Sequence, residues 1–452
     1  MAKAVFKEMQ DRLGPGARPQ PVGRIVAIDP ATITLEGIGS VGRIGDRLRL
    51  LSPLSDGFFA QIVRISGDRT IALPDGPSTG LRTGQRMLLE GRAGIAPSAA
   101  WLGRVVDPFG APLDGKPLAP GAVPLAIEGP PPPPVARRAF GDRLSTGLRA
   151  FNTFLPLVRG QRVGLFAGSG VGKSTLLGQF CRGVSADVVV VGLIGERGRE
   201  VRHFAEEVLG AEGLARTVIV AATSDRPAQE RRRCAFSAMA VAEYFRDQGN
   251  NVLLIVDSIT RLAEAHREIA TAAGESAALR GFPPSTAHTL TSLCERAGTG
   301  AGASGDITAV FSVLVAGSDM EEPVADMLRG VLDGHVVLDR SIAERGRFPA
   351  VDLSRSVSRA LPGAASDDEN ARLMEARRRL ALYEKSEMMV QAGLYTTGTD
   401  AVIDEAIASF PLIDAFLAED EPDGIEESFT RLGSVLSLGA RKAWASLGKS
   451  AG

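Results

Sequence analysis

The chain has 452 residues, too many for one compact hydrophobic core, and this length predicts about three domains of ~150 residues each. Its 44% hydrophobic and 23% charged residues are close to the average of globular proteins, which excludes a wholly disordered, collagenous or coiled-coil chain. Lysine and arginine number 51 against 53 aspartate and glutamate, a formal net charge of -2. No overall field attracts nucleic acid, and we predict no nucleic-acid partner.

The cysteine content predicts a reducing environment. Cys181, Cys234 and Cys294 lie far apart in the sequence and form no CxxC pair, so neither a disulfide framework nor a zinc site is indicated. The N-terminus lacks the apolar segment of a signal peptide, and no apolar run approaches the ~20 residues that span a bilayer. We therefore expect a cytoplasmic protein whose contact with a membrane, where it has one, is peripheral.

Residues 1–21 have the pattern of a tail. Apolar side chains recur on one face of a short helix, at Ala2, Val5, Phe6, Met9 and Leu13. The glycine- and proline-rich stretch from Gly14 to Pro21 then breaks this pattern. Two interpretations stay open, a frayed terminus and a helix that docks on a partner or a membrane surface, because so short a helix is marginal in water by itself.

Residues 22–92 predict a small β-barrel domain. Short segments rich in β-branched residues alternate with Gly and Asp, as in GRIVAID, TITLEGI, DRLRLL, AQIVRI and TIALP. Beyond this domain, tight Gly/Pro turns in WLGRVVDPFGAPLDG precede five consecutive prolines, Pro130 to Pro134. Such a proline run is typical of a stiff spacer.

Residues 93–359 predict an α/β domain with a mostly parallel sheet. Continuous apolar runs such as VVVVGLIG, NVLLIVD and ITAVFSVLV alternate with stretches of helical period such as FSAMAVAEYFRDQG, a pattern of buried strands connected by helices. In residues 360–452 helix formers dominate, and we predict a small all-helical C-terminal domain. Asp367, Asp368 and Glu369 mark a helix N-terminus there, and Glu419–Ser428 is interpreted as an exposed acidic connector.

The strongest functional motif is a phosphate-binding loop between the predicted strand RVGLF and the predicted helix TLLGQF. It fits G-x-x-x-x-G-K-[ST] with alanine at the first position. In such a loop, backbone N–H groups surround phosphate oxygens, the lysine neutralises β/γ charge and the hydroxyl reaches Mg²⁺. The nucleotide-binding residues are Ala167, Gly168, Ser169, Gly170, Val171, Gly172, Lys173, Ser174 and Thr175.

Two carboxylates follow apolar strands and are candidates for hydrolysis. Asp257 ends NVLLIVD, which places it at the carboxyl edge of the sheet beside the loop, where it can hold Mg²⁺ through a water. Glu196 in GLIGERGRE follows another apolar strand and can orient and polarise the attacking water.

From Val22 to the C-terminus the sequence resembles the F1-type rotary and type III secretion ATPases, and most closely their flagellar protein export branch. The resemblance is carried by segments in the family's order: LGRVVDPFGAPLDG, GLRAFNTFLPLVRGQRVGLFAGSGVGKSTLL, GLIGERGREV, AEYFRDQGNNVLLIVDSITR, GFPPSTAHTLTSLCERAG, MEEPVADMLRGVLDGHVVLDR and FPAVDLSRSVSR. It implies a RecA-like P-loop NTPase core preceded by a β-barrel and followed by helices.

The resemblance also implies residue roles. It assigns Lys173 to the phosphates, Ser174 and Asp257 to Mg²⁺, the latter through water, and Glu196 to the catalytic carboxylate. It places Arg197 and Arg261 around the catalytic site and Phe348 against the adenine, and it makes Arg359 the finger that reaches the γ-phosphate of a neighbouring subunit.

By this resemblance we expect a homohexamer that uses ATP and Mg²⁺ and energises flagellar protein export from the cytoplasmic face of the inner membrane. Implied partners are a stator-like regulator at the N-terminal tail, a coiled-coil stalk in the ring centre, the membrane proteins of the export gate, and export substrates with their chaperones. None of these partners is visible in the residues themselves.

Three alternatives remain. A virulence-type injectisome ATPase shares every motif quoted above. A proton-driven ATP synthase subunit is disfavoured by FAGSGVGKS in place of a GGAGVGKT-type loop and by EKSEMMVQAGLYTTGTD where the F1 catalytic subunit has an acidic loop. A noncatalytic ring subunit would typically lose the catalytic glutamate, whereas this chain has Glu196.

Overall fold

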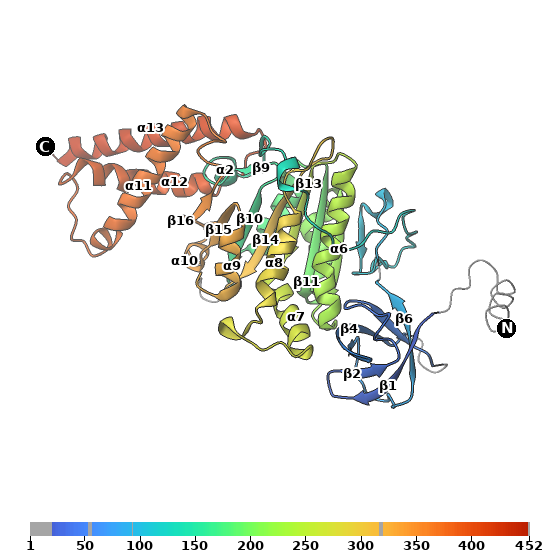
Figure 1. Cartoon of the computed structure of the whole chain (residues 1–452). Helices are drawn as coiled ribbons and strands as arrows, with labels where there is room; N and C mark the ends of the chain where they lie inside the picture. The colour runs from blue at the N-terminus through green and yellow to red at the C-terminus, as the bar shows by residue number, and fades with distance from the viewer. Residues whose placement is uncertain (1–19, 53–56, 93, 316–319, 451–452) are drawn as a thin grey trace, which may run out of the picture. The chain divides into compact units, whose positions relative to one another are not determined.

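A computed structural model describes residues 20–52, 57–92, 94–315 and 320–450 (Figure 1). For residues 279 and 444–450 it describes the backbone alone. Nearly all of the predicted N-terminal tail lies outside the described residues. The described residues divide into two compact units. The first consists of residues 20–94 with 227–229 and 267–277, and the second contains the rest, including the C-terminal helices.

The first unit contains the predicted barrel. Six strands close on themselves in the order β1-β2-β5-β4-β3-β6, and all pairs are antiparallel. Alternate side chains fill the interior, as Ile33 and Leu35 do on β2, because successive residues of a strand point to opposite faces. The strands are β1 (Val22–Ile28), β2 (Ile33–Glu36), β3 (Arg47–Leu50), β4 (Phe59–Ser66), β5 (Arg69–Pro74) and β6 (Arg86–Gly91).

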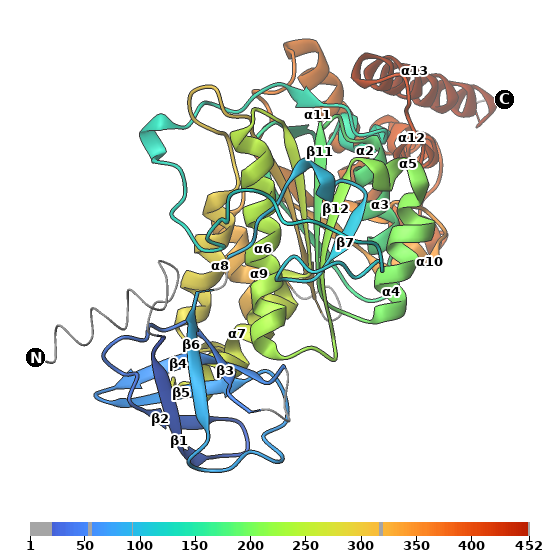
Figure 2. The ribbon, with the colours of Figure 1, turned by 90° about the vertical axis from the view of Figure 1, so that its right-hand side faces the viewer.

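The second unit is built on a sheet with the order β16-β15-β10-β14-β13-β11-β12-β7 (Figure 2). Every neighbouring pair is parallel except β15 with β16. This confirms the predicted mostly parallel sheet. The strands are β7 (Arg104–Val106), β10 (Arg162–Ala167), β11 (Val188–Glu196), β12 (Thr217–Thr223), β13 (Val252–Asp257), β14 (Ile307–Leu314), β15 (Gly334–Leu338) and β16 (Val351–Ser358).

Both faces of this sheet are buried, which explains why its strands are continuously apolar. On β13, Leu253 and Ile255 belong to one hydrophobic core, whereas Leu254 and Val256 belong to the other. The first core includes residues of α3 (Lys173–Gly183), α4 (Gly198–His203), the π-helical turn Phe204–Leu209, and α5 (Gly210–Ala215) with its partly buried Leu214. The second includes residues of α6 (Ala228–Asp247), α7 (Ile259–Ala272), α8 (Ser285–Arg296) and α9 (Pro323–Val331).

Shorter elements connect these layers. They are the 3₁₀ turns Ala99–Trp101, Pro134–Ala136 and Leu279–Gly281, the strand pair β8 (Arg143–Leu144) and β9 (Leu157–Val158), and the helices α2 (Arg149–Asn152) and α10 (Arg340–Glu344). After the proline run, two arginines bond this segment to the residues around the start of β14. Arg137 donates to the carbonyl of Glu295, and Arg138 pairs with Asp306 at 2.6 Å.

The C-terminal residues form the predicted helices α11 (Asp367–Gln391), α12 (Ala401–Leu417) and α13 (Ile425–Ser450). The acidic N-terminus predicted for α11 is confirmed by a capping box, in which Ser366 and Glu369 each accept from the other's backbone N–H. The interpretation of residues 419–428 as an exposed connector is wrong for Glu421 and Ser428. The Glu421 side chain is 1% exposed and pairs with Arg149 of α2 at 2.8 Å. Ser428 is fully buried and already lies in α13, which begins at Ile425.

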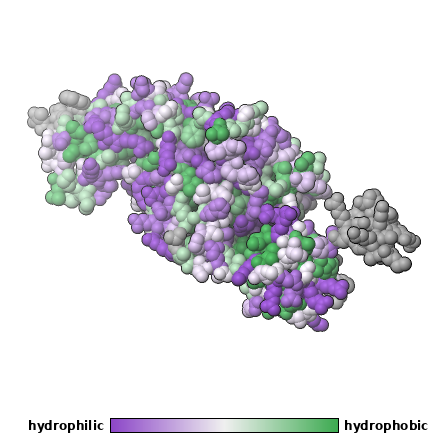
Figure 3. Space-filling model, viewed as in Figure 1, coloured by the Kyte–Doolittle hydropathy of each residue, from purple (hydrophilic) through white to green (hydrophobic). Residues whose placement is uncertain are grey.

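Hydrophilic residues spread over the visible surface of the second unit (Figure 3). Within the described residues, no helix combines the length and the apolar character needed to cross a membrane.

Candidate nucleotide site

The predicted phosphate loop forms at the carboxyl end of β10. Gly170 and Gly172 have φ angles of 78° and 86°, which residues with a side chain rarely adopt, so glycine is required at both positions. Helix α3 then begins at Lys173. No side chain of the described residues caps its N-terminus and no acidic residue lies in its first turn, so the N–H groups of that turn fit an anion.

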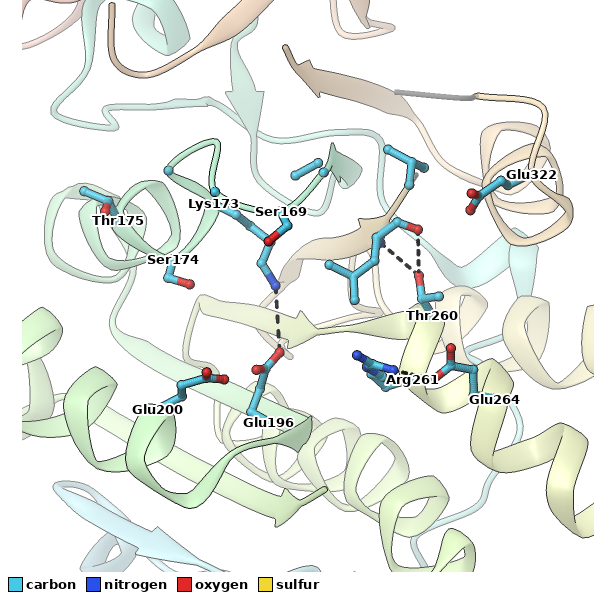
Figure 4. Close-up of a pocket in the computed structure, with 16 residues that line it drawn as sticks. Ser169, Lys173, Ser174, Thr175, Glu196, Glu200, Thr260, Arg261, Glu264 and Glu322 are labelled. Atoms are coloured by element: carbon cyan, nitrogen blue, oxygen red, sulfur yellow. Dashed lines mark hydrogen bonds and ion pairs between the residues drawn. The ribbon is translucent and has the colours of Figure 1, made fainter. Parts of the chain in front are cut away.

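These residues line a cavity of about 720 Å³ (Figure 4). The cavity is lined by Ala167, Gly168, Ser169, Gly170, Gly172, Lys173, Ser174, Thr175, Glu196, Glu200, Thr260, Arg261, Glu264, Leu314, Val315 and Glu322. The structure therefore brings the phosphate loop, the predicted Glu196 and the predicted Arg261 to one site, although they are far apart in the sequence.

Lys173 lies between two carboxylates. Its ammonium group is 3.9 Å from Glu196, toward which it points in Figure 4, and it donates a hydrogen bond to Asp257. Asp257 is only 4% exposed and accepts a second hydrogen bond from Ser312 of β14. The lysine is thus held at the loop by charges from β11 and β13.

Glu196 and Glu200 form a hydrogen-bonded pair of carboxyl groups. Burial is the largest cause that raises the pKa of Glu196, and the hydrogen bond that its protonated carboxyl donates to Glu200 and the charge of Asp257 add to it. With the opposing charge of Lys173, the pKa is about 7. The same hydrogen bond lowers the pKa of Glu200. Near neutral pH Glu196 is therefore poised between its protonated and ionised forms, as a group that exchanges protons during a reaction must be.

Helix α7 supplies three further side chains. Thr260 accepts a hydrogen bond from the backbone N–H of Leu314 at 2.9 Å, which ties α7 to the end of β14. Arg261 points toward Glu264 in Figure 4 and pairs with it at 2.8 Å. Since α7 begins two residues after Asp257, one strand-to-helix connection positions both the buried aspartate and this arginine.

Five predicted site residues do not line the cavity. Asp257 is buried and accepts a hydrogen bond from Lys173, as described above. Val171 is 2% exposed and packs into the core, and the largely exposed side chain of Arg197 precedes α4, 3.8 Å from Glu200. Phe348 is 48% exposed beside the loop, since a Cβ built on Gly172 would be 3.1 Å from its ring.

Arg359 is the fifth of these residues. Its side chain is exposed, and its guanidinium donates to the carbonyl of Arg329 at 3.4 Å.

Six lining residues were not predicted from the sequence: Glu200, Thr260, Glu264, Leu314, Val315 and Glu322. Glu200 lies in α4, the helix that follows Glu196, and Thr260 and Glu264 are one turn apart on α7, the helix that follows Asp257. Polar residues in the first turns of the helix after each predicted carboxylate were therefore a usable signal. Glu322 has no such signal, because it comes from the segment before α9.

The donor set fits a nucleotide phosphate with Mg²⁺. The helix N-terminus and Lys173 provide positive potential for phosphates, and the Ser174 hydroxyl lies beside the carboxylates of Glu196 and Glu200 (Figure 4). In the described part of the chain, no group of three or more His, Cys, Asp or Glu residues could hold a metal ion alone. Mg²⁺ suits this arrangement, since it binds through few protein ligands together with phosphates and water.

Known proteins are similar to this chain in both sequence and fold. Residues 147–358 match the ATP synthase alpha/beta family, nucleotide-binding domain, and residues 365–434 match the T3SS EscN ATPase C-terminal domain. A flagellum-specific ATP synthase of Caulobacter vibrioides is 44% identical over 424 residues, 92% of this chain and 95% of that protein. The chain belongs to the family of flagellum-specific ATP synthases and type III secretion ATPases.

Other relatives support the assignment of this chain to the family. The SPI-2 type 3 secretion system ATPase of Salmonella typhimurium is 45% identical over 84% of this chain and 87% of that protein. The assembled ATPase EscN of enteropathogenic E. coli superposes with a TM-score of 0.85 at 38% identity, over 92% of this chain and 100% of that one. The resemblance and the predicted ATP-hydrolysing activity are thereby confirmed.

The raised pKa of Glu196 predicts that the nucleotide-free ATPase loses stability as the pH rises from 4.5 to about 7. The folded chain keeps the proton up to about 7, whereas the unfolded chain releases it near the usual value of 4.5, so the unfolded state binds fewer protons in this window. Glu196→Gln stays neutral and should gain stability over the wild type as the pH rises. Melting temperatures of both proteins across this range measure the gap, and a gap independent of pH would contradict the prediction.

Proposed function

We propose that this ATPase hydrolyses ATP with Mg²⁺ in the cavity around Lys173. Lys173 neutralises charge on the β- and γ-phosphates, and the N–H groups at the start of α3 bind phosphate oxygens. Ser174 and Asp257 hold Mg²⁺, Asp257 through a water. The metal ion supplies further neutralisation of the charge that develops on the transferred phosphoryl group.

In this proposal Glu196 orients and polarises the attacking water. A general base works best when its pKa is near the operating pH. The partly buried position of Glu196, the largest cause of its pKa of about 7, is the observation that carries this assignment. Arg261 lines the same cavity and Arg197 lies at its edge, and we assign both to charge stabilisation around the site; the exposed ring of Phe348 is assigned to the adenine.

We further propose that Arg359 acts on the nucleotide of a neighbouring subunit in a homohexamer. Its guanidinium is exposed and does not line the cavity of its own chain, so it is available to another copy. The similar ATPase EscN is described as assembled, which supports a ring. An arginine that reaches the γ-phosphate from outside stabilises the transition state by ~10³-fold or more.

The remaining assignments follow the same family. We propose a coiled-coil stalk in the ring centre, supported by a structure of EscN in complex with its central stalk EscO. A stator-like regulator at the N-terminal tail, the export gate, and export substrates with their chaperones are further proposed partners, at the cytoplasmic face of the inner membrane. The proposed domains are the tail 1–21, the barrel 22–92, the RecA-like domain 93–359 and the helical domain 360–452.

We propose flagellar export as the process that is energised. Flagellum-specific relatives from Caulobacter vibrioides, Bacillus subtilis and Pseudomonas aeruginosa align over 92%, 89% and 94% of this chain. The type 3 secretion ATPases of Salmonella typhimurium and Xanthomonas euvesicatoria align over 84% and 83%, and a flagellum-specific relative of Salmonella typhimurium over 80%. Injectisome secretion is the second candidate, because EscN superposes over 92% of the chain.

Glu196→Gln should leave ATP binding nearly intact and lower hydrolysis by several orders of magnitude, because the amide cannot accept the proton of the attacking water. Steady-state phosphate release and the dissociation constant of a fluorescent ATP analogue measure the two effects. Glu207→Gln, an exposed glutamate of the following π-helical turn outside the cavity, is the matched control. Turnover retained by the variant would remove Glu196 from its role.

Arg359→Ala should abolish the steep rise of specific activity with protein concentration that an active site between subunits requires. Rings mixed from Arg359→Ala and Lys173→Ala chains should regain part of the activity, since some interfaces then combine an intact loop with an intact arginine. Phosphate release from mixed and unmixed samples, with ring assembly checked by light scattering, measures this. Two assembling variants without any rescue would count against an arginine acting between subunits.

Deletion of the gene in the source organism should stop the export of flagellar filament protein and with it swimming. Immunoblots of culture supernatants for filament protein, with restored export from a plasmid copy as the control, give the result. Normal filaments combined with loss of another secreted protein would instead support the injectisome assignment.

A further inference from the structure

The backbone position from which Arg359 extends is held by hydrogen bonds to polar groups of neighbouring strands. The N–H of Arg359 donates to the carbonyl of Asp333 at 3.0 Å. Ser358, the last residue of β16, directly precedes it. The Ser358 hydroxyl donates to the carbonyl of Pro156 at 2.9 Å and accepts from the side-chain amide of Gln161 at 3.1 Å. With both a donor and an acceptor partner, this hydroxyl fixes one rotamer and one position of the strand end.

Gln161 links this position to the strand that carries the phosphate loop. Its side chain is fully buried, and its amide also donates to the carbonyl of Asp333 at 3.3 Å. Its oxygen accepts from the N–H of Val158 at 3.1 Å, so the side chain is satisfied at both ends. Gln161 directly precedes β10, which ends at Ala167 in the loop. One side chain therefore contacts both the residue before Arg359 and the carbonyl that binds Arg359.

Asp333 is itself fixed against β10. Its carboxylate accepts from the backbone N–H of Arg162 at 3.0 Å and from the guanidinium at 3.0 and 3.1 Å, and its own N–H donates to the carbonyl of Arg162 at 2.8 Å. The next residue, Gly334, pairs with Ser358, and a Cβ there would lie 2.7 Å from the carbonyl oxygen of Val357. The strands approach closely at this point, which leaves little room for displacement.

We propose that Gln161 and Ser358 are positioning residues for the arginine that serves the neighbouring subunit. This inference rests on the proposed function, in which Arg359 stabilises the transition state across the ring interface. Neither residue lines the nucleotide cavity of its own chain, so both act through Arg359. Gln161 directly precedes β10, which ends in the phosphate loop. The hydrogen bonds of Gln161 and Ser358 therefore set the position of Arg359 relative to the phosphate loop of the same chain.

The expected effect follows from the geometry that catalysis needs. A charged group misplaced by ~1 Å loses about 10²-fold in rate, because its stabilisation is realised only in the transition state. Loss of the Ser358 hydroxyl frees the end of β16 and leaves ATP binding in the chain's own cavity unchanged. The variant should therefore lower kcat and leave KM nearly constant.

The test compares full-length assembled rings of Ser358→Ala, Ser358→Thr and Ser356→Ala with the wild type and Arg359→Ala. Ser356 is the matched control, since it is a buried serine on the same strand whose hydroxyl bonds Val337 and Asp352 and not Gln161. We measure kcat, KM and retention of ADP with aluminium fluoride, which imitates the transferring phosphoryl group. Gln161→Met, similar in volume and without the amide, repeats the test from the other side of the hydrogen bond.

We expect Ser358→Ala to lower kcat by ~10-fold or more with KM within about twofold, and to weaken retention of the analogue. Ser358→Thr should restore most of the rate, and Ser356→Ala should match the wild type. Equal losses in Ser356→Ala and Ser358→Ala, or no loss in Ser358→Ala and Gln161→Met while Arg359→Ala is inactive, would overturn the inference. Full activity of Arg359→Ala would instead refute the proposed role of that arginine.

Discussion

The nucleotide site depends on one constraint, the burial of a parallel sheet on both faces. Because apolar side chains of β10, β11 and β13 enter two separate cores, these strands are fixed in a single register. Their carboxyl ends lie at one edge of the sheet, where the chain turns into loops and polar side chains can be exposed to a ligand. Lys173, Glu196 and Asp257 each come at or just after the end of such a strand, so the packing of the core places the charges of the site.

The free-energy cost of burying these charged groups is offset by the ion pairs between them. Lys173 is held by Asp257 and lies 3.9 Å from Glu196, which compensates the removal of these groups from water. Glu196 is the least compensated of the three, and its pKa rises to about 7 mainly through burial. The same desolvation that destabilises its ionised form therefore makes it suited to accept a proton at neutral pH.

A second set of polar contacts lies at the opposite, N-terminal end of β10. There Gln161, Arg162 and Asp333 connect the first residues of β10 to the start of β15 and the end of β16. One strand thus carries the phosphate loop at one end and anchors the exposed Arg359 at the other. The position of Arg359 is therefore tied, through β10, to the phosphate loop of the same chain.

The sequence by itself determined the barrel, the mostly parallel sheet, the C-terminal helices and the phosphate loop, because alternation, continuous apolar runs and glycine spacing are local consequences of strand, helix and loop geometry. Tertiary structure alone decided the rest. It added Glu200, Thr260 and Glu264 to the cavity from helices packed on the sheet, Glu322 from the segment before α9, and Leu314 and Val315 from the end of β14. It buried Glu421 against Arg149, although a run of acidic residues indicates an exposed connector. Contacts between residues far apart in the chain carry no local pattern, and only the packed core fixes them.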